Sequence, residues 1–305
     1  MENVYHNGEK AIQELLGESE NAARFGRGIK STLTGKAMHF IQKQLLALVS
    51  TTDEKEQLWA SILVGDLGFI KVPTAQKIVF NEKLIRSTLT DIFYQNIEKK
   101  QEIGTLFVEL HTRRRYRANG KVTRKNGKIE LAIEQMYANC PKFIQRNELS
   151  LPKETVALQP KIIKGKDLAE TTKKWISQAN AFFVATKNAP NQTDTSYRGG
   201  NDGFIEILPN GLLRIPDYPG NSHYSTFGNI YENPNAGLLF VNFEKGITLQ
   251  LTGTVAFNFN QKSVADMAKS ADTGRFWLFE TKAWILTENH HQVDWSFMDY
   301  SPYNP

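Results

Sequence analysis

Apolar and polar residues alternate over short stretches through most of the chain, a pattern that predicts β-strands. The clearest of these stretches are LLALVST (45–51), TLFVEL (105–110), KIELAIEQMY (128–137), AFFVAT (181–186), LLFVNF (238–243) and RFWLFETKAWIL (275–286). Turn signals such as Pro209-Asn210-Gly211 separate neighbouring stretches. Apolar residues at helical spacing occur around residues 37–44, 168–179 and 261–271. The pattern predicts an α+β fold dominated by antiparallel strands, with short flanking helices.

The chain repeats this pattern once. Residues 41–72 and 176–207 align at a constant offset of 135, and residues 104–122 and 237–255 align at an offset of 133. Fifteen of the 51 aligned pairs are identical, where ordinary composition would give roughly three or four. Each copy runs from a helix through a strand and a hairpin to a pair of long strands. We therefore predict two tandem β-barrels that arose by internal duplication.

Turn-forming and weakly periodic segments set the expected domain limits. We expect an N-terminal helix and loop at 1–35, a first barrel at 36–150, a linker at 151–165 and a second barrel at 166–305. The linker is placed where LSLPKETVALQPKIIKG (149–165) combines two prolines with weak periodicity. Two such barrels in one chain would form an internal pseudo-dimer.

Composition places the chain among globular proteins, since 40% of its 305 residues are hydrophobic and 23% are charged. No apolar run approaches the ~20 residues of a membrane span, and residues 1–10 lack the apolar core of a signal peptide. The single cysteine, Cys140, has no partner for an internal disulfide. We therefore expect a cytoplasmic protein with no membrane partner. The formal net charge of +5 suits an anionic small ligand as well as a nucleic acid.

Polar residues stand at both ends of the hairpin in the second copy, in SYRGG (196–200) and DYPGN (217–221). In a strand, Ser196 and Arg198 face one way and Tyr197 faces the other. The two following glycines permit the close approach of a ligand, and Arg198 offers a bidentate contact to a phosphate or a polar ring edge. The second segment supplies the Asp217 carboxylate, exposed backbone amides and the Asn221 amide. A solvated glycine-rich hairpin is the alternative interpretation.

The first copy carries a run of arginines, RRRYR (113–117). In a strand, Arg113, Arg115 and Arg117 face the same way, and three guanidinium groups repel one another unless an anion or carboxylates lie opposite. A phosphate explains them, while a solvated edge strand and a nucleic-acid patch are the alternatives. The aligned second-copy segment, ITLQLTG (247–253), has no arginine. This difference favours a single ligand held between unlike halves.

Other candidate residues carry less weight. Cys140 has no second cysteine or nearby histidine at metal-ligand spacing, so a small buried residue is favoured over a nucleophile. His290 and His291 lie in a polar segment, where a solvated pair is favoured over a metal site. The sequence has neither the dinucleotide-binding glycine motif nor a P-loop.

Taken together, these residues resemble a family: the predicted flavin-nucleotide-binding proteins related to pyridoxamine 5'-phosphate oxidase. The motifs that carry the resemblance occur in the same order and cover residues 36–305. They are WASILVGDLGFI (59–70), TRRRYRANG (112–120), QMYANCPKFIQR (135–146), SYRGG (196–200) with GFIEIL (203–208), IPDYPGN (215–221) with FGNI (227–230) and GLLFVNF (237–243), and YSPYNP (300–305). The resemblance implies split β-barrels that bind flavin mononucleotide (FMN), usually between two barrels.

The resemblance also implies roles for particular residues. Ser196, Tyr197 and Arg198 would lie at the isoalloxazine edge or the phosphate, and the turn would bind the ribityl chain or the phosphate. Arg115 and Arg117 would add positive charge from the first barrel, and Trp59 and Ser61 would face the ligand there, with Trp59 stacked on a ring. The full set of candidate cofactor-binding residues is Trp59, Ser61, Arg115, Arg117, Ser196, Tyr197, Arg198, Asp217, Gly220, Asn221 and Ser222.

The chain departs from the enzyme that gives the family its name. Gly220-Asn221-Ser222 replaces the usual Ser-Arg-Lys, and the substrate-phosphate arginines have no counterpart. We therefore expect an FMN-dependent oxidoreductase that does not act on pyridoxamine phosphate. A non-catalytic flavin carrier or sensor is the alternative, and a basic nucleic-acid-binding protein is a third class, although no nucleic-acid partner is expected. Electrons would come from NAD(P)H or a redox partner protein, and a homodimer could complete further sites.

Overall fold

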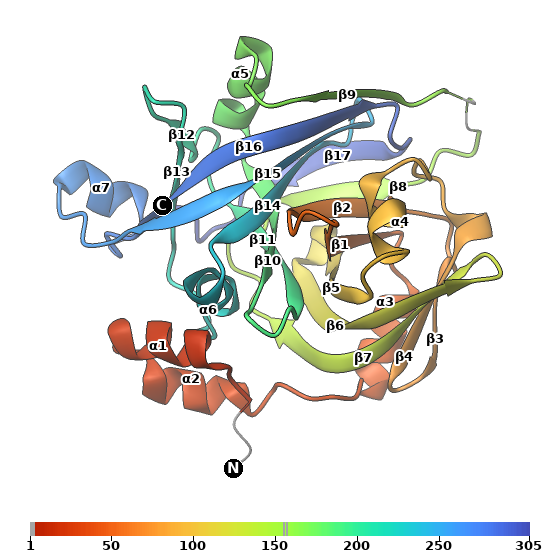
Figure 1. Cartoon of the computed structure of the whole chain (residues 1–305), viewed down its shortest axis with the longest axis horizontal. Coiled ribbons are helices and arrows are strands. Elements are labelled where there is room, and N and C mark those ends of the chain that lie inside the picture. Colours follow the sequence, from red (N-terminus) through yellow and green to blue (C-terminus); the bar gives the residue numbers. More distant parts are fainter. Residues whose placement is uncertain (1–3, 155, 157) are drawn as a thin grey trace.

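The computed structural model describes residues 4–154, 156 and 158–305. Its first unit is a seven-stranded antiparallel sheet in the order β2-β1-β5-β6-β7-β4-β3 (Figure 1). The strands are β1 (Leu46–Thr52), β2 (Leu58–Val64), β3 (Ile70–Thr74), β4 (Lys77–Asn81), β5 (Glu102–Glu109), β6 (Arg114–Lys125) and β7 (Lys128–Asn139). Helices α3 (Gly35–Gln42) and α4 (Ile92–Ile97) flank the sheet, with the short 3-10 turns η1 (Glu82–Leu84) and η2 (Leu110–Thr112).

The second unit is built on the sheet order β11-β10-β14-β15-β16-β13-β12, with β9 paired to β16. The strands are β9 (Lys161–Gly165), β10 (Ala181–Lys187), β11 (Thr193–Gly199), β12 (Glu206–Ile207), β13 (Leu213–Pro216), β14 (Asn235–Asn242), β15 (Ile247–Asn258) and β16 (Phe276–Glu288). Its helices are α5 (Glu170–Gln178), α6 (Ser225–Glu232) and α7 (Val264–Lys269).

The two sheets have the same strand order once the aligned copies are matched, with β1 corresponding to β10, β2 to β11 and β6 to β15. The predicted β-dominated fold of two tandem split barrels is confirmed. Within the described part of the chain, no strand ladder closes either sheet into a complete barrel. The equal order is what a duplicated unit would produce, and duplication as the origin stays a prediction.

Segments outside the two sheets tie the units together. Helix α1 (Asn7–Leu15) packs against α6 of the second unit (Figure 1). Helix α2 (Ser19–Gly26) packs against α1, and its Ala22 shares a buried cluster with Tyr137 of β7 in the first unit. Strand β8 (Arg146–Ser150), which follows the first sheet, pairs with β17 (Asp294–Asp299) near the end of the chain. Strand β9 occupies the last five residues of the predicted linker. The expected domain limits themselves stay a prediction. No helix in the described ranges is long and apolar enough to cross a membrane.

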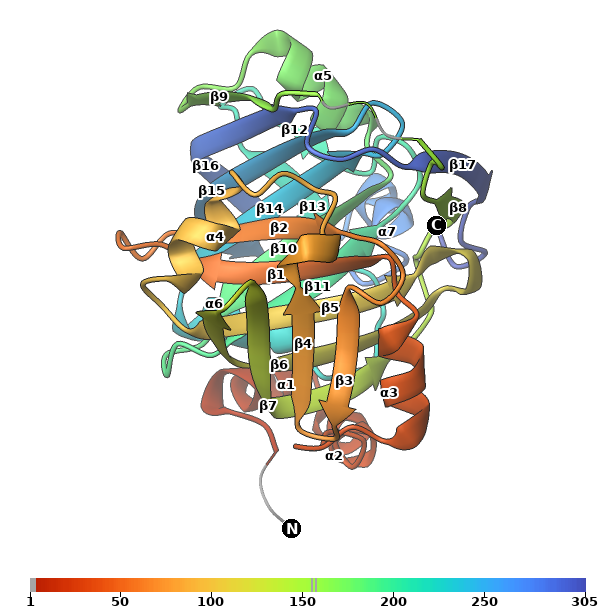
Figure 2. The ribbon, with the colours of Figure 1, turned by 90° about the vertical axis from the view of Figure 1, so that its right-hand side faces the viewer.

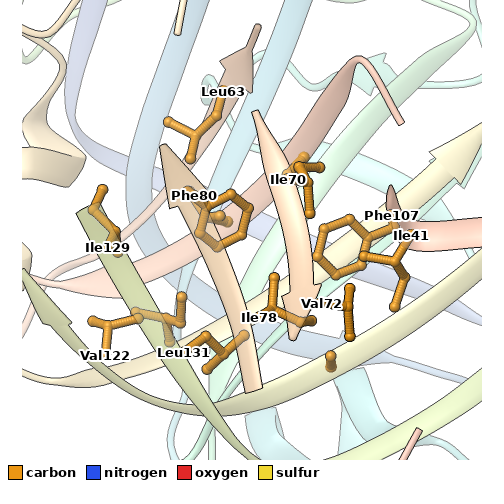
Figure 3. Close-up of a cluster of buried hydrophobic side chains, with 14 of the residues drawn as sticks. Ile41, Leu63, Ile70, Val72, Ile78, Phe80, Phe107, Val122, Ile129 and Leu131 are labelled. Atoms are coloured by element: carbon orange, nitrogen blue, oxygen red, sulfur yellow. The ribbon is translucent and has the colours of Figure 1, made fainter. Parts of the chain in front are cut away.

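Strand β1 shows how the sequence pattern places the core. Every residue of β1 is buried, because its two faces meet different cores. Ala47 and Val49 join the core of the first unit, drawn in Figure 3, while Leu46 and Leu48 face a core shared by the two units. Alternate residues of one strand therefore serve two cores.

Two glycines allow the units to approach closely. A Cβ atom on Gly237 of β14 would lie 2.5 Å from the backbone oxygen of Leu58, and one on Gly104 of β5 would lie 2.5 Å from Cα of Asp194. These glycines occupy aligned positions in the two copies, so the units pack in a pseudo-symmetric way, β2 against β14 and β11 against β5. This packing, seen from a second side in Figure 2, brings β11 beside β6, where the candidate site lies.

Candidate functional site

A cavity lies at the junction of the units and is here called the arginine cavity. Its volume is about 100 Å³. Its walls come from β6, the segment after β7, the end of β11 and the loop that leads into α6. The lining residues are Arg115, Arg117, Asn139, Cys140, Lys142, Phe143, Tyr197, Arg198, Gly199, Phe204, Pro216, Asp217, Tyr218, Gly220, Asn221, Ser222, His223, Tyr224, Ser225, Thr226 and Phe227.

Arg117 joins the units through a buried network. Its Nη1 donates to Asp194 Oδ2 at 2.7 Å and to the Tyr137 hydroxyl at 2.8 Å, and its Nη2 donates to Ser196 Oγ at 2.6 Å. Burial, the largest single effect, would lower the pKa of Arg117, but the Asp194 carboxylate and the Tyr137 hydroxyl together outweigh it and raise the pKa above its usual range. Arg117 therefore already has its counter-charge within the protein.

Arg115 and Arg198 are less completely paired. Arg115 is buried and donates from Nε to the Cys140 carbonyl at 3.0 Å, and burial lowers its pKa to about 10. Arg198 Nη1 lies 3.7 Å from Asp217 Oδ1, and its buried Nε has no hydrogen-bond partner in the described part of the chain. Burial lowers the pKa of Arg198 although Asp217 opposes the shift. Asp217 lies closer to Arg275, with 2.9 Å from its Oδ2 to Nε.

Helix α6 adds backbone donors to the same cavity. The helix begins at Ser225, after Ser222 and Tyr224 adopt left-handed backbone conformations with φ of 59° and 56°. Residues of its first turn line the cavity, and the free N–H groups of a helix N-terminus favour an anion. The charged side chains of the lining are four cations, Arg115, Arg117, Lys142 and Arg198, against the Asp217 carboxylate. The arrangement can hold an anionic group.

Most of the candidate residues meet here. Tyr197, Arg198, Asp217 and Gly220 line the cavity, as do Arg115, Arg117, Asn221 and Ser222, and Ser196 lies directly behind Arg117. Two of the turn residues also bond within the protein. Asn221 Oδ1 accepts from the His223 amide at 3.3 Å, and the Ser222 hydroxyl donates to Glu18 of the N-terminal segment at 2.9 Å.

Trp59 and Ser61 do not line this cavity, contrary to expectation. Trp59 Nε1 donates to Asp53 at 3.0 Å, and Ser61 Oγ donates to Asp91 at 2.6 Å and accepts from Gln250 Nε2 at 2.8 Å. The physical reason is that β2 packs against β14 and β15 of the second unit. Both residues therefore lie on the opposite side of the junction. They occupy the position that corresponds to Asp194 and Ser196 when the two copies are aligned, here called the pseudo-equivalent position.

Arg113 also departs from the prediction. The strand begins only at Arg114, and Arg113 ends η2 in a left-handed conformation, with φ of 59°. Its Nε donates to the Ile144 carbonyl at 2.8 Å, and its guanidinium forms an ion pair with Asp299. Only Arg115 and Arg117 share the expected face.

The pseudo-equivalent position has the same hydrogen-bond plan without the cations. Gln250 donates to Ser61 there, just as Arg117 donates to Ser196 in the arginine cavity. The second partner of the serine hydroxyl is Asp91 at the pseudo-equivalent position and Thr226 in the arginine cavity. In the alignment of the two copies, Leu63 and Thr248 occupy the places of Arg198 and Arg115. His290 Nε2 lies 3.2 Å from Asp91 Oδ2 and both side chains are fully buried. The three arginines therefore occur at one of the two positions.

Several residues that shape the site were missed from the sequence. Asp194 and Tyr137 complete the Arg117 network, and Asp194 could have been found because it lies two residues before Ser196 on the same face of a strand. Gln145 donates to the Gly200 carbonyl at 2.9 Å, and its Oε1 accepts from the Ser301 amide at 2.8 Å. The C-terminal segment thus holds the loop that carries Phe143. Cys140 is half-buried and lines the cavity.

Comparisons with known proteins give partial structural similarity. No family model matches the chain, and no curated protein matches it. HupZ of Group A Streptococcus is similar at 20% identity and a TM-score of 0.28, covering 35% of this chain and 93% of its own. A second similar structure is a candidate pyridoxamine 5'-phosphate oxidase from Lactobacillus delbrueckii, at 12% identity and a TM-score of 0.29, with 36% of this chain and 96% of its own covered. A third is an FMN-binding protein from Syntrophomonas wolfei, at 9% identity and a TM-score of 0.27, with 42% of this chain and 95% of its own covered. Each match covers less than half of this chain.

Proposed function

We propose that this chain binds FMN in the arginine cavity. The observation that carries the proposal is the pair Arg115 and Arg198, two largely buried guanidinium groups without a full set of acceptors, beside the N-terminus of α6. Such a cluster calls for an anion with several oxygen atoms, and a phosphate provides them. The motif resemblance described above names the rest of the ligand as a flavin.

The size of the cavity limits which part of the ligand it can hold. Its volume, about 100 Å³, is below the roughly 300–1,000 Å³ typical of small-molecule sites, so the phosphate end would lie inside it and the rest of FMN would extend outside. Phe143 and Tyr218 line the cavity with ring centroids 4.7 Å apart and offer flat surfaces to an aromatic ring. Arg115, Arg198 and the amides of residues 220–222 would hold the phosphate end, and Arg117 would keep the two walls in position.

A bound flavin would supply the electron or hydride transfer. On this basis we propose an oxidoreductase, with a nicotinamide or a redox protein as electron donor. The arginine run does not offer a basic stripe for nucleic acid, because Arg115 and Arg117 are buried and Arg113 and Arg114 pair with Asp299 and Glu109. A flavin carrier without turnover is distinguished by adding NADH or NADPH to the flavin-loaded protein without oxygen, since a carrier would keep its visible absorption.

The first test is the visible absorption spectrum of the purified protein, followed by chromatography of any released chromophore and by titration with FMN. Arg198→Ala should weaken FMN binding about 10- to 100-fold, because a hydrogen bond to a charged group contributes about 1.5–3 kcal/mol. Riboflavin, which has no phosphate, should lose much less. Arg124→Ala is the matched control, since Arg124 also lies on β6 but pairs with Glu82 at the surface. A protein that takes up no FMN, or an Arg198→Ala variant with unchanged affinity, would contradict the proposal.

A further inference from the structure

A second and larger cleft lies on the other side of the Arg117–Asp194 pair and is here called the N-terminal cleft. Its volume is about 1,190 Å³. Residues between 4 and 31 form one wall, and β6, β7, β11 and α6 form the others; Figure 1 shows α1 and α2 below α6. Ser225 lines both the cleft and the arginine cavity, while Asp194 and Tyr137 face the cleft. The two spaces are therefore neighbours with a common wall.

Glu9 is the chemically unusual residue of this cleft. It is only 4% exposed, and its carboxylate accepts from the His6 amide at 3.1 Å, with His6 Nε2 at 3.5 Å. Within the described ranges, no lysine or arginine lies within ion-pair distance of Glu9. A buried carboxylate without a full counter-charge is costly. Glu9 has the His6 amide and imidazole as partners, where Asp194 has the Arg117 guanidinium.

The rest of the lining is polar and more acidic than basic. Thr193, at 2% exposure, lines the cleft, and its Oγ1 has no hydrogen-bond partner in the part of the chain that the structure describes. Glu102 and Glu134 add two more carboxylates, while the cations Arg27 and Lys30 are exposed residues of the N-terminal segment. The ring of Tyr5 also lines the cleft. The lining thus combines the Glu9 carboxyl, held by His6, with the buried Thr193 hydroxyl and the Tyr5 ring.

We propose that the N-terminal cleft is a second ligand site, which takes a small organic molecule carrying a protonated amine. The ammonium group would pair with the Glu9 carboxylate and thereby complete its counter-charge. The Thr193 hydroxyl would bond a polar atom of the same molecule, and an apolar part would lie against Tyr5. An anion is disfavoured here, because the cleft carries more carboxylates than cations. The proposal does not depend on flavin in the neighbouring cavity.

The protonation of Glu9 supports this assignment. Burial raises its pKa to about 7, and the nearby His6 offsets only part of the shift. An ammonium ligand would favour the ionised carboxyl, so binding should release a proton from Glu9 and should strengthen as the pH rises from 6 to 8.

The test is isothermal titration calorimetry on the full chain at pH 8 with three probes of similar shape: benzylamine, benzyl alcohol and benzoate. We expect saturable binding of one benzylamine per chain and at least tenfold weaker binding of the neutral and anionic probes. Glu9→Gln should lose at least tenfold in benzylamine affinity. The control Glu134→Gln, which removes a carboxyl paired with Lys121 near the surface, should change it less than twofold.

A second variant keeps the test decisive if Glu9→Gln fails to fold. Thr193→Val keeps the shape of the side chain and removes the hydroxyl, and we expect it to weaken benzylamine several-fold. Flavin occupancy should be unchanged in both variants, which separates this proposal from the FMN proposal. Absence of benzylamine binding, equal affinity for all three probes, or binding unaffected by Glu9→Gln and Thr193→Val would overturn the inference.

Discussion

Replacing Arg117 by leucine should destabilise the protein strongly, because the Asp194 carboxylate would stay buried without its cation. The two side chains are 8% and 5% exposed, and Arg117 Nη1 lies 2.7 Å from Asp194 Oδ2. Breaking such a buried pair costs about 3–5 kcal/mol. The same change removes the donors to Tyr137 and Ser196. We therefore expect the free energy of unfolding to fall by at least about 3 kcal/mol.

The matched variant removes both charges together, as Arg117→Leu with Asp194→Leu. Apolar residues of similar volume often replace a buried ion pair without loss of stability, so the double variant should recover most of the stability lost in the single one. The pseudo-equivalent position also lacks this ion pair, because Gln250 and Trp59 stand there in place of Arg117 and Asp194. The coupling energy between Arg117 and Asp194, obtained from the parent protein, the two single variants and the double variant, should be about 2 kcal/mol or more.

The assay is urea unfolding followed by both tryptophan fluorescence and circular dichroism. Two probes are needed because a chain of two units can unfold in more than one step. A loss below about 1 kcal/mol in Arg117→Leu would refute the reasoning. A double variant less stable than either single variant would refute it as well, since packing and not charge would then hold these residues together.

Two further predictions concern stability. Because folding raises the pKa of Glu9 from its usual value of 4.5 to about 7, between these pH values the carboxyl keeps its proton in the folded state and loses it in the unfolded state. The stabilising contribution of Glu9 therefore falls by about 3 kcal/mol as the pH rises through this window. Glu9→Gln removes that fall. As the pH rises from 4.5 to 7, the free energy of unfolding of the variant, measured with urea, should therefore increase relative to that of the parent protein. A difference that stays constant with pH would contradict the pKa shift. Gly237→Ala should cost about 1–3 kcal/mol, since its Cβ would meet the Leu58 backbone, while Gly35→Ala, with open space around its Cβ, should be neutral in thermal unfolding.

The architecture could be predicted because it depends on local pattern. Alternation along segments such as 45–51 and 238–243 gave the strands, and the aligned copies gave two units of one kind. The turn residues 217–222 and Arg198 were found because polar groups and glycines at strand ends are unusual in a hairpin. Apart from the repeat, each of these signals lies within about ten residues of sequence, which is the range over which backbone geometry fixes side-chain direction.

The contacts between the units could not be predicted in the same way. Arg117 and Asp194 are 77 residues apart, and their meeting depends on how two sheets pack at Gly104 and Gly237. The same packing sends Ser61 to the opposite side of the junction from Arg117. Arg113 was misplaced for a local reason, because a single left-handed residue ahead of β6 ended the alternation. The N-terminal cleft escaped notice because Glu9 looks like an ordinary surface residue of a helix until α1 is packed against α6.

The unlike halves of this chain also bear on how its stability is distributed. In a homodimer of identical units, symmetry would repeat every residue at both positions. Arginines buried on one side would then be buried on the other side as well, and their desolvation cost would be doubled. Here the desolvation of Arg115, Arg117 and Arg198 falls on one side only. The opposite side combines Gln250, Leu63 and Thr248 with the stacked rings of Phe243 and Trp295, whose centroids lie 4.2 Å apart. The cost of desolvating three guanidinium groups thus falls on one edge of the junction, while the other edge buries neutral polar groups such as Ser61 and Gln250.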